Sequence, residues 1–142
     1  MKYFDDFEIG DKSVSKGRTI TETDIVMFAA FSGDWHQLHT NVEFAKKGPF
    51  GERIAHGFLV LVAASGLMPL EEMAILAFYG MDKVRFLGPT KIGDTIHVEM
   101  EAIEKEDKNE KNGVVSFKSS IKNQKEENLA VFIMKFSLHK QR

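Results

Sequence analysis

The chain has 142 residues, of which 43% are hydrophobic and 28% charged, a balance that suits one folded domain with a single core. Its 19 Lys and Arg against 21 Asp and Glu give a formal net charge of −2, so no basic surface for nucleic acid is indicated. Because the sequence contains no cysteine, it excludes disulfides, zinc–thiolate sites and a cysteine nucleophile.

The sequence gives no sign of a membrane segment. Its start carries Asp5 and Asp6 where a secretory signal needs an apolar run. The longest apolar stretch, residues 58–64, is too short to span a bilayer. We therefore expect a cytoplasmic protein with no membrane partner.

Helix signals dominate the first half of the chain. Residues 13–20 are predicted to form a short strand, after which Thr21 begins a helix. Thr21 and Asp24 have the spacing of a capping box, and apolar residues follow at helical intervals. Gly33 is the expected end of this helix, because glycine enters the left-handed conformation without a steric cost.

A short polar and aromatic segment, residues 34–40, follows this helix and reads as a loop. Asn41 is then predicted to cap a brief second helix that includes Phe44 and Ala45. Residues 47–53 read as a loop because they include a Gly-Pro pair and a further glycine.

Residues 57–70 form the predicted central helix. Apolar side chains cover nearly every side of it, so we expect it to be buried all round. The small residues 63–66 would let a sheet approach the helix backbone closely, and Pro69 ends the pattern.

The second half reads as strand after strand. Residues 95–103 alternate between apolar and polar side chains, which is typical of a half-buried strand. The last strand is apolar on both faces near its middle, which favours a central position. The four predicted strands are residues 74–87 with a break at Gly80, 95–103, 114–123 and 129–139.

These elements predict an α+β fold, with one long central helix wrapped by an antiparallel sheet in a single domain over residues 1–142. A sheet of this length leaves edges that oligomerisation could cover.

The densest group of reactive side chains lies in residues 31–40. Asp34 and His39 are five residues apart, so a compact loop could bring both to one pocket. A carboxylate and an imidazole that share one water can remove and return its protons near neutral pH. An Asp directly after a helix is also a common capping or Asx-turn residue.

Gly57 begins the apolar helix directly after His56. The first amides of a helix have no partner within it and carry partial positive charge, so they can hold an anion or a polarised carbonyl. Glycine leaves that approach open, although it could equally relieve packing at the helix start. Together with Asp34 and His39, this amide would suit addition of water to an alkene conjugated with a carbonyl.

Four segments of the chain resemble the MaoC-like dehydratases and R-specific enoyl-CoA hydratases. Residues 32–40 read Ser-Gly-Asp-x-x-x-Leu-His-Thr, like the hydratase-2 motif, and residues 55–57 read Ala-His-Gly. Residues 4–11 and 86–94 are similar to the segments that frame this motif in the family. The resemblance covers nearly the whole chain.

The resemblance implies a hot-dog fold, a homodimer or higher homo-oligomer, and a trans-2-enoyl-CoA substrate. Asp34 and His39 would activate water, and Gly57 would supply the oxyanion-hole amide. The product would be a 3-hydroxyacyl-CoA of R configuration. Ser65 would lie near the site and support it without taking part in the reaction. Coenzyme A belongs to the substrate, so no separate cofactor is expected.

The flanking residues of the motif depart from the family pattern or have several readings. The family commonly has Asn-Pro where this chain has His36 and Gln37, and His36 could still donate the asparagine's hydrogen bond. Trp35 is expected to form a wall of the pocket or a core anchor, and His56 a substrate-binding or supporting residue. Asp34 and the nearby histidines show no recognised metal-ligand spacing, so no metal is expected.

Two other functions remain open from the sequence. A hot-dog thioesterase would carry an acid on the central helix, and residues 58–65 contain no Asp or Glu. A non-catalytic acyl-CoA-binding module would not need the pair of Asp34 and His39. Three scattered cations could meet the phosphates of coenzyme A: Lys83, Arg85 and Lys91.

Overall fold

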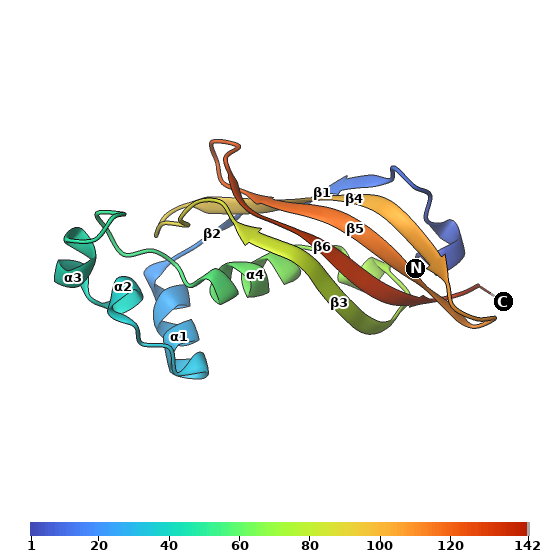
Figure 1. Ribbon diagram of the computed structural model, residues 1–142, viewed down its shortest axis with the longest axis horizontal. Helices are drawn as coiled ribbons and strands as arrows, with labels where there is room; N and C mark the ends of the chain where they lie inside the picture. Colours follow the sequence, from blue (N-terminus) through green and yellow to red (C-terminus); the bar gives the residue numbers. More distant parts are fainter. Residues whose placement is uncertain (142) are drawn as a thin grey trace.

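The computed structural model describes residues 1–141, and an antiparallel sheet forms its largest part (Figure 1). The strand order is β1-β4-β5-β6-β3, and β2 pairs with β4 beside this path. The strands are β1 (Lys12–Val14), β2 (Arg18–Thr19), β3 (Ile75–Phe86), β4 (Thr95–Asp107), β5 (Asn112–Lys122) and β6 (Asn128–His139).

The strand β4 confirms the alternation that was predicted for residues 95–103. In β4, Ile96, Val98 and Met100 are buried, while the residues between them are partly exposed. The last strand, β6, has a neighbour on each side, as its apolar middle predicted, although β5 holds the middle of the order. The strand β3 runs through Gly80 without ending, and a register shift with β6 absorbs the irregularity there.

Within residues 1–141, four α-helices and two short 3-10 helices accompany the sheet. The two 3-10 helices, η1 and η2, precede β1 and β3. The bounds are η1 (Phe4–Asp6), α1 (Glu22–Ser32), α2 (Gln37–Thr40), α3 (Val42–Lys46), α4 (Gly57–Ser65) and η2 (Leu70–Glu72). Within the described part of the chain, no helix is long and apolar enough to cross a membrane.

The start and end of α1 are those predicted. The Thr21 hydroxyl accepts a hydrogen bond from the Asp24 amide, and the Asp24 carboxylate accepts one from the Thr21 amide. The helix ends at Gly33, which has φ 80°. The Asn41 side chain likewise accepts from the Phe44 amide and caps α3, as predicted.

The central helix α4 packs one face against the sheet. Leu59, Val60, Ala63 and Ala64 are buried in the common core. The prediction of burial all round was wrong for the single chain, because Phe58 is 75% exposed and Val62 is 58% exposed. These two residues lie on the opposite face of α4. The helix also ends at Ser65, before the predicted 70, and a short turn and η2 follow it.

Two further predictions needed correction. The single strand expected over residues 13–20 is two short strands, because Lys16 and Gly17 interrupt the pairing with β4. Ser15 still bonds to β4, since its amide donates to the Val98 carbonyl and its hydroxyl accepts from the Val98 amide. The segment 34–40, expected to be a loop, contains the short helix α2. This turn of helix depends on local side-chain bonds that the apolar pattern does not reveal.

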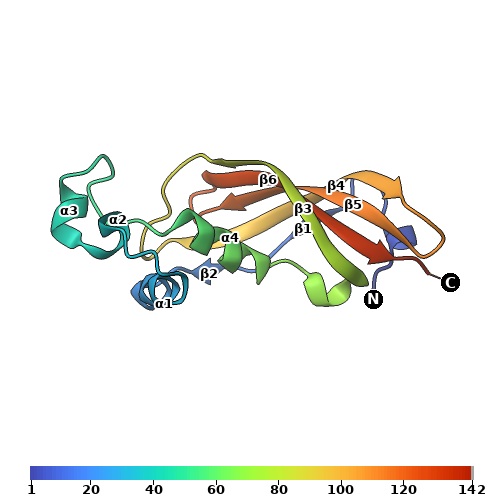
Figure 2. The ribbon, with the colours of Figure 1, turned by 60° about the horizontal axis from the view of Figure 1, so that its bottom comes forward.

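The helices α1, α2 and α3 lie together beyond one end of the sheet, next to the start of α4 (Figure 1). Figure 2 shows the same grouping from another side, with α4 covering one face of the sheet. The fold therefore brings the α1–α2 turn and the first residues of α4 to the same end of the molecule.

Candidate active site

The turn after α1 positions Asp34. Gly33 reverses the chain in the left-handed conformation, and the Asp34 amide donates to the Ser32 hydroxyl at 3.1 Å. One Asp34 carboxylate oxygen accepts a hydrogen bond from the His36 amide at 3.1 Å. Asp34 thus forms the local Asx-type turn that its position after a helix suggested, and its carboxylate is held at a defined place.

The short helix α2 carries His39 on its inner side. His36 caps this helix, since its Nδ1 accepts from the Leu38 amide at 3.0 Å. The Thr40 hydroxyl donates to the carbonyl of Trp35 at 3.0 Å and to that of His36 at 3.1 Å. These local bonds fix the backbone from which the His39 side chain projects.

The His39 ring is oriented by a backbone carbonyl from a distant part of the sequence. Its Nδ1 lies 2.8 Å from the Ile54 carbonyl oxygen, and the residue is only 9% exposed. Because a carbonyl can only accept, Nδ1 must carry the hydrogen, which leaves a lone pair on Nε2. His39 is therefore presented as a neutral base.

Burial favours this neutral form. Desolvation is the largest influence and lowers the pKa of His39, while the hydrogen bond to the Ile54 carbonyl raises it. His56 and His36 lower the pKa further, and the Asp34 carboxylate raises it. The balance keeps the pKa of His39 below the ordinary histidine value of 6.5.

His56 lies against the face of His39. The two rings stack with centroids 3.9 Å apart and an interplanar angle of 29°. The Nε2 of His56 lies 3.0 Å from the Asp34 carbonyl oxygen and donates to it. The residue is 2% exposed.

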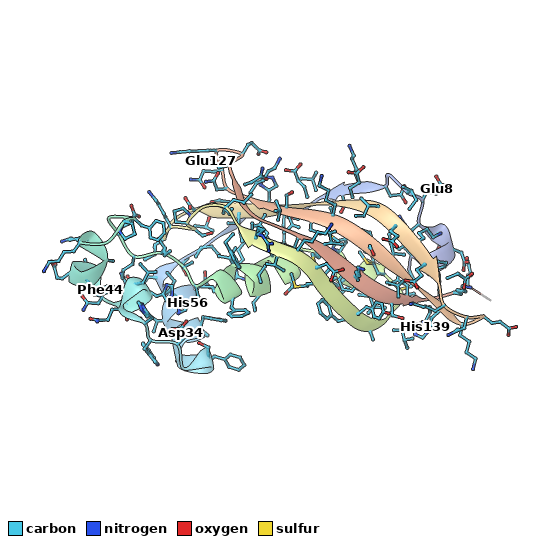
Figure 3. The ribbon with its side chains drawn as sticks, in the orientation of Figure 1. Glu8, Asp34, Phe44, His56, Glu127 and His139 are labelled. Atoms are coloured by element: carbon cyan, nitrogen blue, oxygen red, sulfur yellow. The ribbon has the colours of Figure 1, made fainter. Side chains whose placement is uncertain are left out.

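Asp34, His39 and His56 converge on one small region. One carboxylate oxygen of Asp34 and one ring nitrogen of each histidine lie within 4.8 Å of one another. Figure 3 shows Asp34 and His56 close together at the end of the molecule where α1 and α2 meet α4. Groups at this separation can share one water molecule, and the expectation that no metal binds here stays a prediction.

His39 and Gly57 line the same cavity, which has a volume of about 500 Å³. Gly57 is the first residue of α4, and the His56 side chain makes no capping bond there. A Cβ on Gly57 would lie 3.0 Å from the Phe86 ring, so a side chain at this position would crowd the cavity wall. The other lining residues are Leu38, Phe50, Ile54, Ala55, Val60, Phe86, Leu87, Gly88, Pro89 and Thr90.

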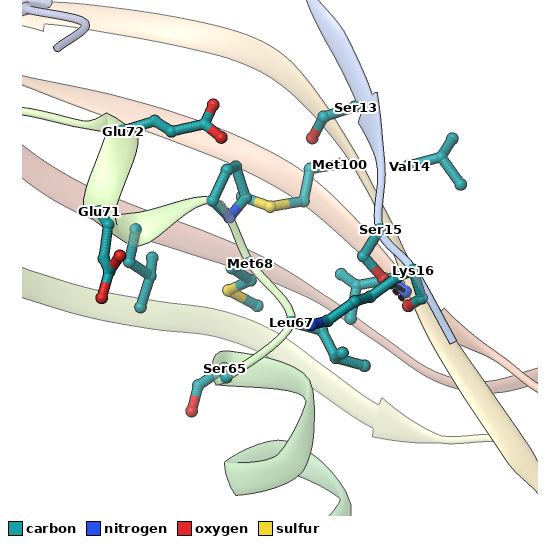
Figure 4. A pocket seen from close by; sticks show the side chains of 14 residues that line it. Ser13, Val14, Ser15, Lys16, Ser65, Leu67, Met68, Glu71, Glu72 and Met100 are labelled. Atoms are coloured by element: carbon teal, nitrogen blue, oxygen red, sulfur yellow. Dashed lines mark hydrogen bonds between the residues drawn. The ribbon is translucent and has the colours of Figure 1, made fainter. Parts of the chain in front are cut away.

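Ser65 does not join this group within the chain. Its hydroxyl donates to the Val62 carbonyl at 2.6 Å, at the far end of α4 from Gly57. It lines a different cavity of about 750 Å³ together with Lys16, Met68 and Glu71 (Figure 4). The expected supporting role of Ser65 therefore finds no contact with the His39 cluster of the same chain.

The remaining predicted residues lie around the cluster. Trp35 is 53% exposed, so the expectation of a core anchor was wrong, and its carbonyl rather than its ring takes part in the fixed turn. Among the cations considered for phosphate binding, Lys91 pairs with Glu52 at 3.4 Å and Arg85 donates to the neighbouring Val84 carbonyl.

Two features of the site carry no signal of their own in the sequence. The Ile54 carbonyl orients His39 from fifteen positions further along the chain, and the Phe86 ring packs over Gly57 from β3. A backbone carbonyl carries no side-chain signal, and the contact with Phe86 depends on how the sheet meets α4. For the contact between Phe86 and Gly57, the sequence offered only the family-like segment that begins at Phe86.

The comparisons with known proteins agree on a family. Residues 6–124 match the family described as MaoC like domain. The chain is 42% identical over 100 residues to a protein named MaoC from Klebsiella aerogenes, covering 70% of this chain and 30% of that protein. It is 34% identical over 102 residues to a 3-hydroxybutyryl-CoA dehydratase from Methylorubrum extorquens, covering 72% and 64%. The chain thus spans less than two thirds of these relatives.

Solved structures share the fold over nearly the whole chain. A structure described as a monoamine oxidase regulatory protein from Archaeoglobus superposes with a TM-score of 0.94 and 42% identity, covering 99% of this chain and 96% of that one. The R-hydratase PhaJ1 from Pseudomonas aeruginosa superposes with 0.76 and 28% identity, covering 99% and 90%. A Mycobacterium tuberculosis protein with a double hotdog fold superposes with 0.87 at 18% identity, covering 99% and 44%.

Proposed function

The chain belongs to the MaoC-like domain family and has the hot-dog fold, and from that premise we propose that it adds water to trans-2-enoyl-CoA and catalyses the reverse dehydration of 3-hydroxyacyl-CoA. The observation that carries the proposal is the meeting of three groups. His39 and Gly57 line one cavity, and the Asp34 carboxylate lies beside His39. The Asp34–His39–Gly57 combination is what hydration of a conjugated thioester requires.

In the proposed mechanism, His39 and Asp34 hold a water molecule beside the double bond. The water oxygen bonds to Cβ as one of its protons moves to Nε2 of His39, whose lone pair is free because Nδ1 donates to the Ile54 carbonyl. The electron pair of the double bond moves toward the thioester oxygen. The Gly57 amide then stabilises the developing negative charge. A proton returned by the pair bonds to Cα and gives the R alcohol.

Supporting roles follow from the contacts around the pair. His36 accepts the Leu38 amide at Nδ1, so its other ring nitrogen carries the hydrogen and can donate, as the asparagine of the family would. The exposed Trp35, next to Asp34 in the chain, is proposed as an outer wall of the pocket. Phe50 and Phe86 line the cavity and suit the apolar part of an acyl group.

The test follows hydration of crotonyl-CoA by the loss of its enoyl absorbance. We expect Asp34→Asn and His39→Ala to lower kcat by roughly 100-fold to 10,000-fold, because each removes part of the proton transfer. Equal rates in the wild type and both variants would contradict the proposal. Release of free CoA thiol would indicate a thioesterase instead, and binding without turnover would indicate a non-catalytic module.

Chiral analysis of the product tests the stereochemical part separately. By similarity to the (R)-specific enoyl-CoA hydratase of Rhodospirillum rubrum, we expect only the R alcohol from crotonyl-CoA. Formation of only the S alcohol would overturn this part and leave the hydration activity standing.

We further propose that the protein acts as a homodimer. Apolar side chains on the outer face of α4 and along the edge strand β3 are exposed in the single chain, including Phe58, Val62, Leu76 and Phe78. An exposed apolar face beside an open sheet edge is the usual setting for association with a second copy. The acyl-CoA thioester is the proposed small-molecule partner.

A further inference from the structure

His56 contacts more of the proposed machinery than any role in substrate binding requires. Its ring stacks on His39 with centroids 3.9 Å apart, and its Nε2 donates to the Asp34 carbonyl at 3.0 Å. The residue precedes Gly57 directly, and its carbonyl accepts the Val60 amide in the first turn of α4. One side chain thus adjoins all three groups to which catalysis is assigned.

Packing alone does not account for a histidine at this position. His56 is 2% exposed, and its Nδ1 is buried without a hydrogen-bond partner in the described part of the protein. Its other neighbour, Phe28, offers only an aromatic ring 4.9 Å away. An apolar ring would fill the same space without leaving a buried acceptor unpaired, so the imidazole must contribute something that phenylalanine would not.

We propose that His56 is a positioning residue that fixes the Asp34 backbone and the His39 ring relative to the Gly57 amide. This proposal rests on the proposed hydration function. The Nε2–H holds the Asp34 carbonyl, while the ring face blocks rotation of His39 away from its bond to the Ile54 carbonyl. We call these two contacts of His56, with the Asp34 carbonyl and with the His39 ring, the clamp. Because His56 also caps α4 through its backbone, a shift of α4 would move the clamp as well.

The same arrangement influences the protonation of His39. The charged or titratable groups that face His39 are Asp34 and His36 from the α1–α2 region and His56 from the start of α4. Of these, Asp34 raises the pKa of His39, and both histidines lower it. Removing the imidazole of His56 therefore takes away one of the influences that lower the pKa of His39, and this pKa should rise toward its ordinary value.

Two substitutions separate the two contacts of His56. His56→Gln keeps an N–H that can reach the Asp34 carbonyl but removes the ring, and His56→Phe keeps the ring but removes the N–H. We expect each to lower kcat for crotonyl-CoA by about tenfold to 100-fold, as loss of an orienting contact does elsewhere, with little change in KM. His139→Gln serves as the matched control, because His139 is exposed and lies at the opposite end of the molecule (Figure 3).

A titration of His39 by NMR gives a readout that does not need turnover. The His39 signal is identified by its loss in His39→Gln, and its pKa is compared between wild type, His56→Gln and His56→Phe. We expect a higher pKa in both His56 variants and no change in His139→Gln. A wild type without hydratase activity would refute the proposed function, while this titration would still decide whether His56 acts on His39.

Three results would overturn the role of His56. The first is an unchanged kcat in both folded variants, and the second is an unchanged pKa of His39 in both. The third applies even if neither variant folds. The ¹⁵N spectrum of the wild type must show His56 with its hydrogen on Nε2 and His39 with its hydrogen on Nδ1, and the opposite tautomer for His56 would refute the clamp.

Discussion

The lowered pKa of His39 sets the acid limit of the proposed reaction. Only the neutral ring can accept a proton from water, so activity falls as the pH drops through the pKa of His39. Burial first, and then the neighbouring histidines, lower that pKa from the ordinary 6.5. We therefore expect the acidic limb of kcat/KM against pH to lie below 6.5, with near-constant activity just above it.

The free enzyme's pH profile with crotonyl-CoA checks this expectation. The control is His97→Gln on β4, which leaves His39 intact. It should show the same acidic limb of kcat/KM as the wild type, since His97 lies in a separate group with Glu99 and Lys122. An acidic limb above 6.5 would contradict the neutral-base role of His39.

Gly57 makes a second prediction at the scale of single residues. In Gly57→Ala the new Cβ would lie 3.0 Å from the Phe86 ring, so the ring must move into the cavity that substrate would use. We expect kcat/KM to fall by about tenfold or more. The free energy of unfolding should change far less than activity, because Phe86 is half exposed and can move.

A double variant distinguishes crowding from loss of the helix start. Gly57→Ala with Phe86→Leu gives the added methyl group more room, and it should recover part of the lost kcat/KM. Phe86→Leu alone is the control. No recovery, combined with an equal loss of stability in Gly57→Ala, would show that the glycine serves the fold and not the site.

The identities of the site residues could be predicted, but their contacts could not. Asp34, His39 and Gly57 stand in a short motif and at a helix start, where residue type carries information. The Ile54 carbonyl that fixes the His39 tautomer, and the stack of His39 on His56, join segments far apart in sequence. Such contacts depend on the tertiary fold, and the pattern of a single sequence does not specify individual contacts between distant segments.

At the scale of elements, the capping of α1 is the feature that supports the site from outside. Thr21 holds the start of the helix whose end places Asp34. Thr21→Ala should lower the free energy of unfolding by about 1 kcal/mol, since one orphan amide loses its acceptor. Urea unfolding measures the effect, and Thr21→Ser, which keeps the hydroxyl, should remain within a few tenths of a kcal/mol of wild type.

Activity gives this helix prediction its second readout. Because Asp34 and Thr21 flank opposite ends of the 11-residue helix α1, fraying at Thr21 should reach the site only weakly, and kcat should fall by less than about threefold. A large loss of kcat with unchanged stability would contradict the view that Thr21 acts through the helix.

The elements that the sequence predicted share a local cause. The capping box of α1 and the alternation of β4 depend only on residues close together in the chain, so they could be identified directly. The short helix α2 depends on His36 and Thr40 bonding to nearby backbone groups, and α4 stops at Ser65 although apolar residues continue. In both places, polar contacts and packing override the periodicity on which the prediction depended.

At the scale of the whole molecule, one face of the single chain leaves apolar side chains exposed beside an open sheet edge. The strand β3 forms an edge of the sheet, and α4 presents its second apolar face outward beside it. The sequence pattern of α4 predicted burial all round, and a single chain supplies only half of that burial. A second copy would cover the exposed half and would reconcile the apolar pattern with the fold.

The proposed dimer makes a direct prediction for α4. Val62 is 58% exposed on the outer face of α4, and Val14 is 68% exposed on β1 at the other edge of the sheet. A carboxylate buried without a partner costs about 3–5 kcal/mol, so Val62→Asp should raise the Kd of the dimer by roughly 100-fold or more. Val14→Asp adds the same charge on β1, outside the proposed interface of α4 and β3, and should leave the Kd unchanged.

Sedimentation velocity over a dilution series measures this Kd, and crotonyl-CoA hydration measured at the same concentrations links it to function. The cavity that holds His39 and Gly57 opens at the end of α4 that also presents Phe58 outward, so dissociation should expose the site to water and lower kcat in parallel with the dimer fraction. A dimeric Val62→Asp would place the interface elsewhere. A dimer broken by Val14→Asp instead would assign the interface to the β1 edge, and an active monomer would show that one chain completes the site.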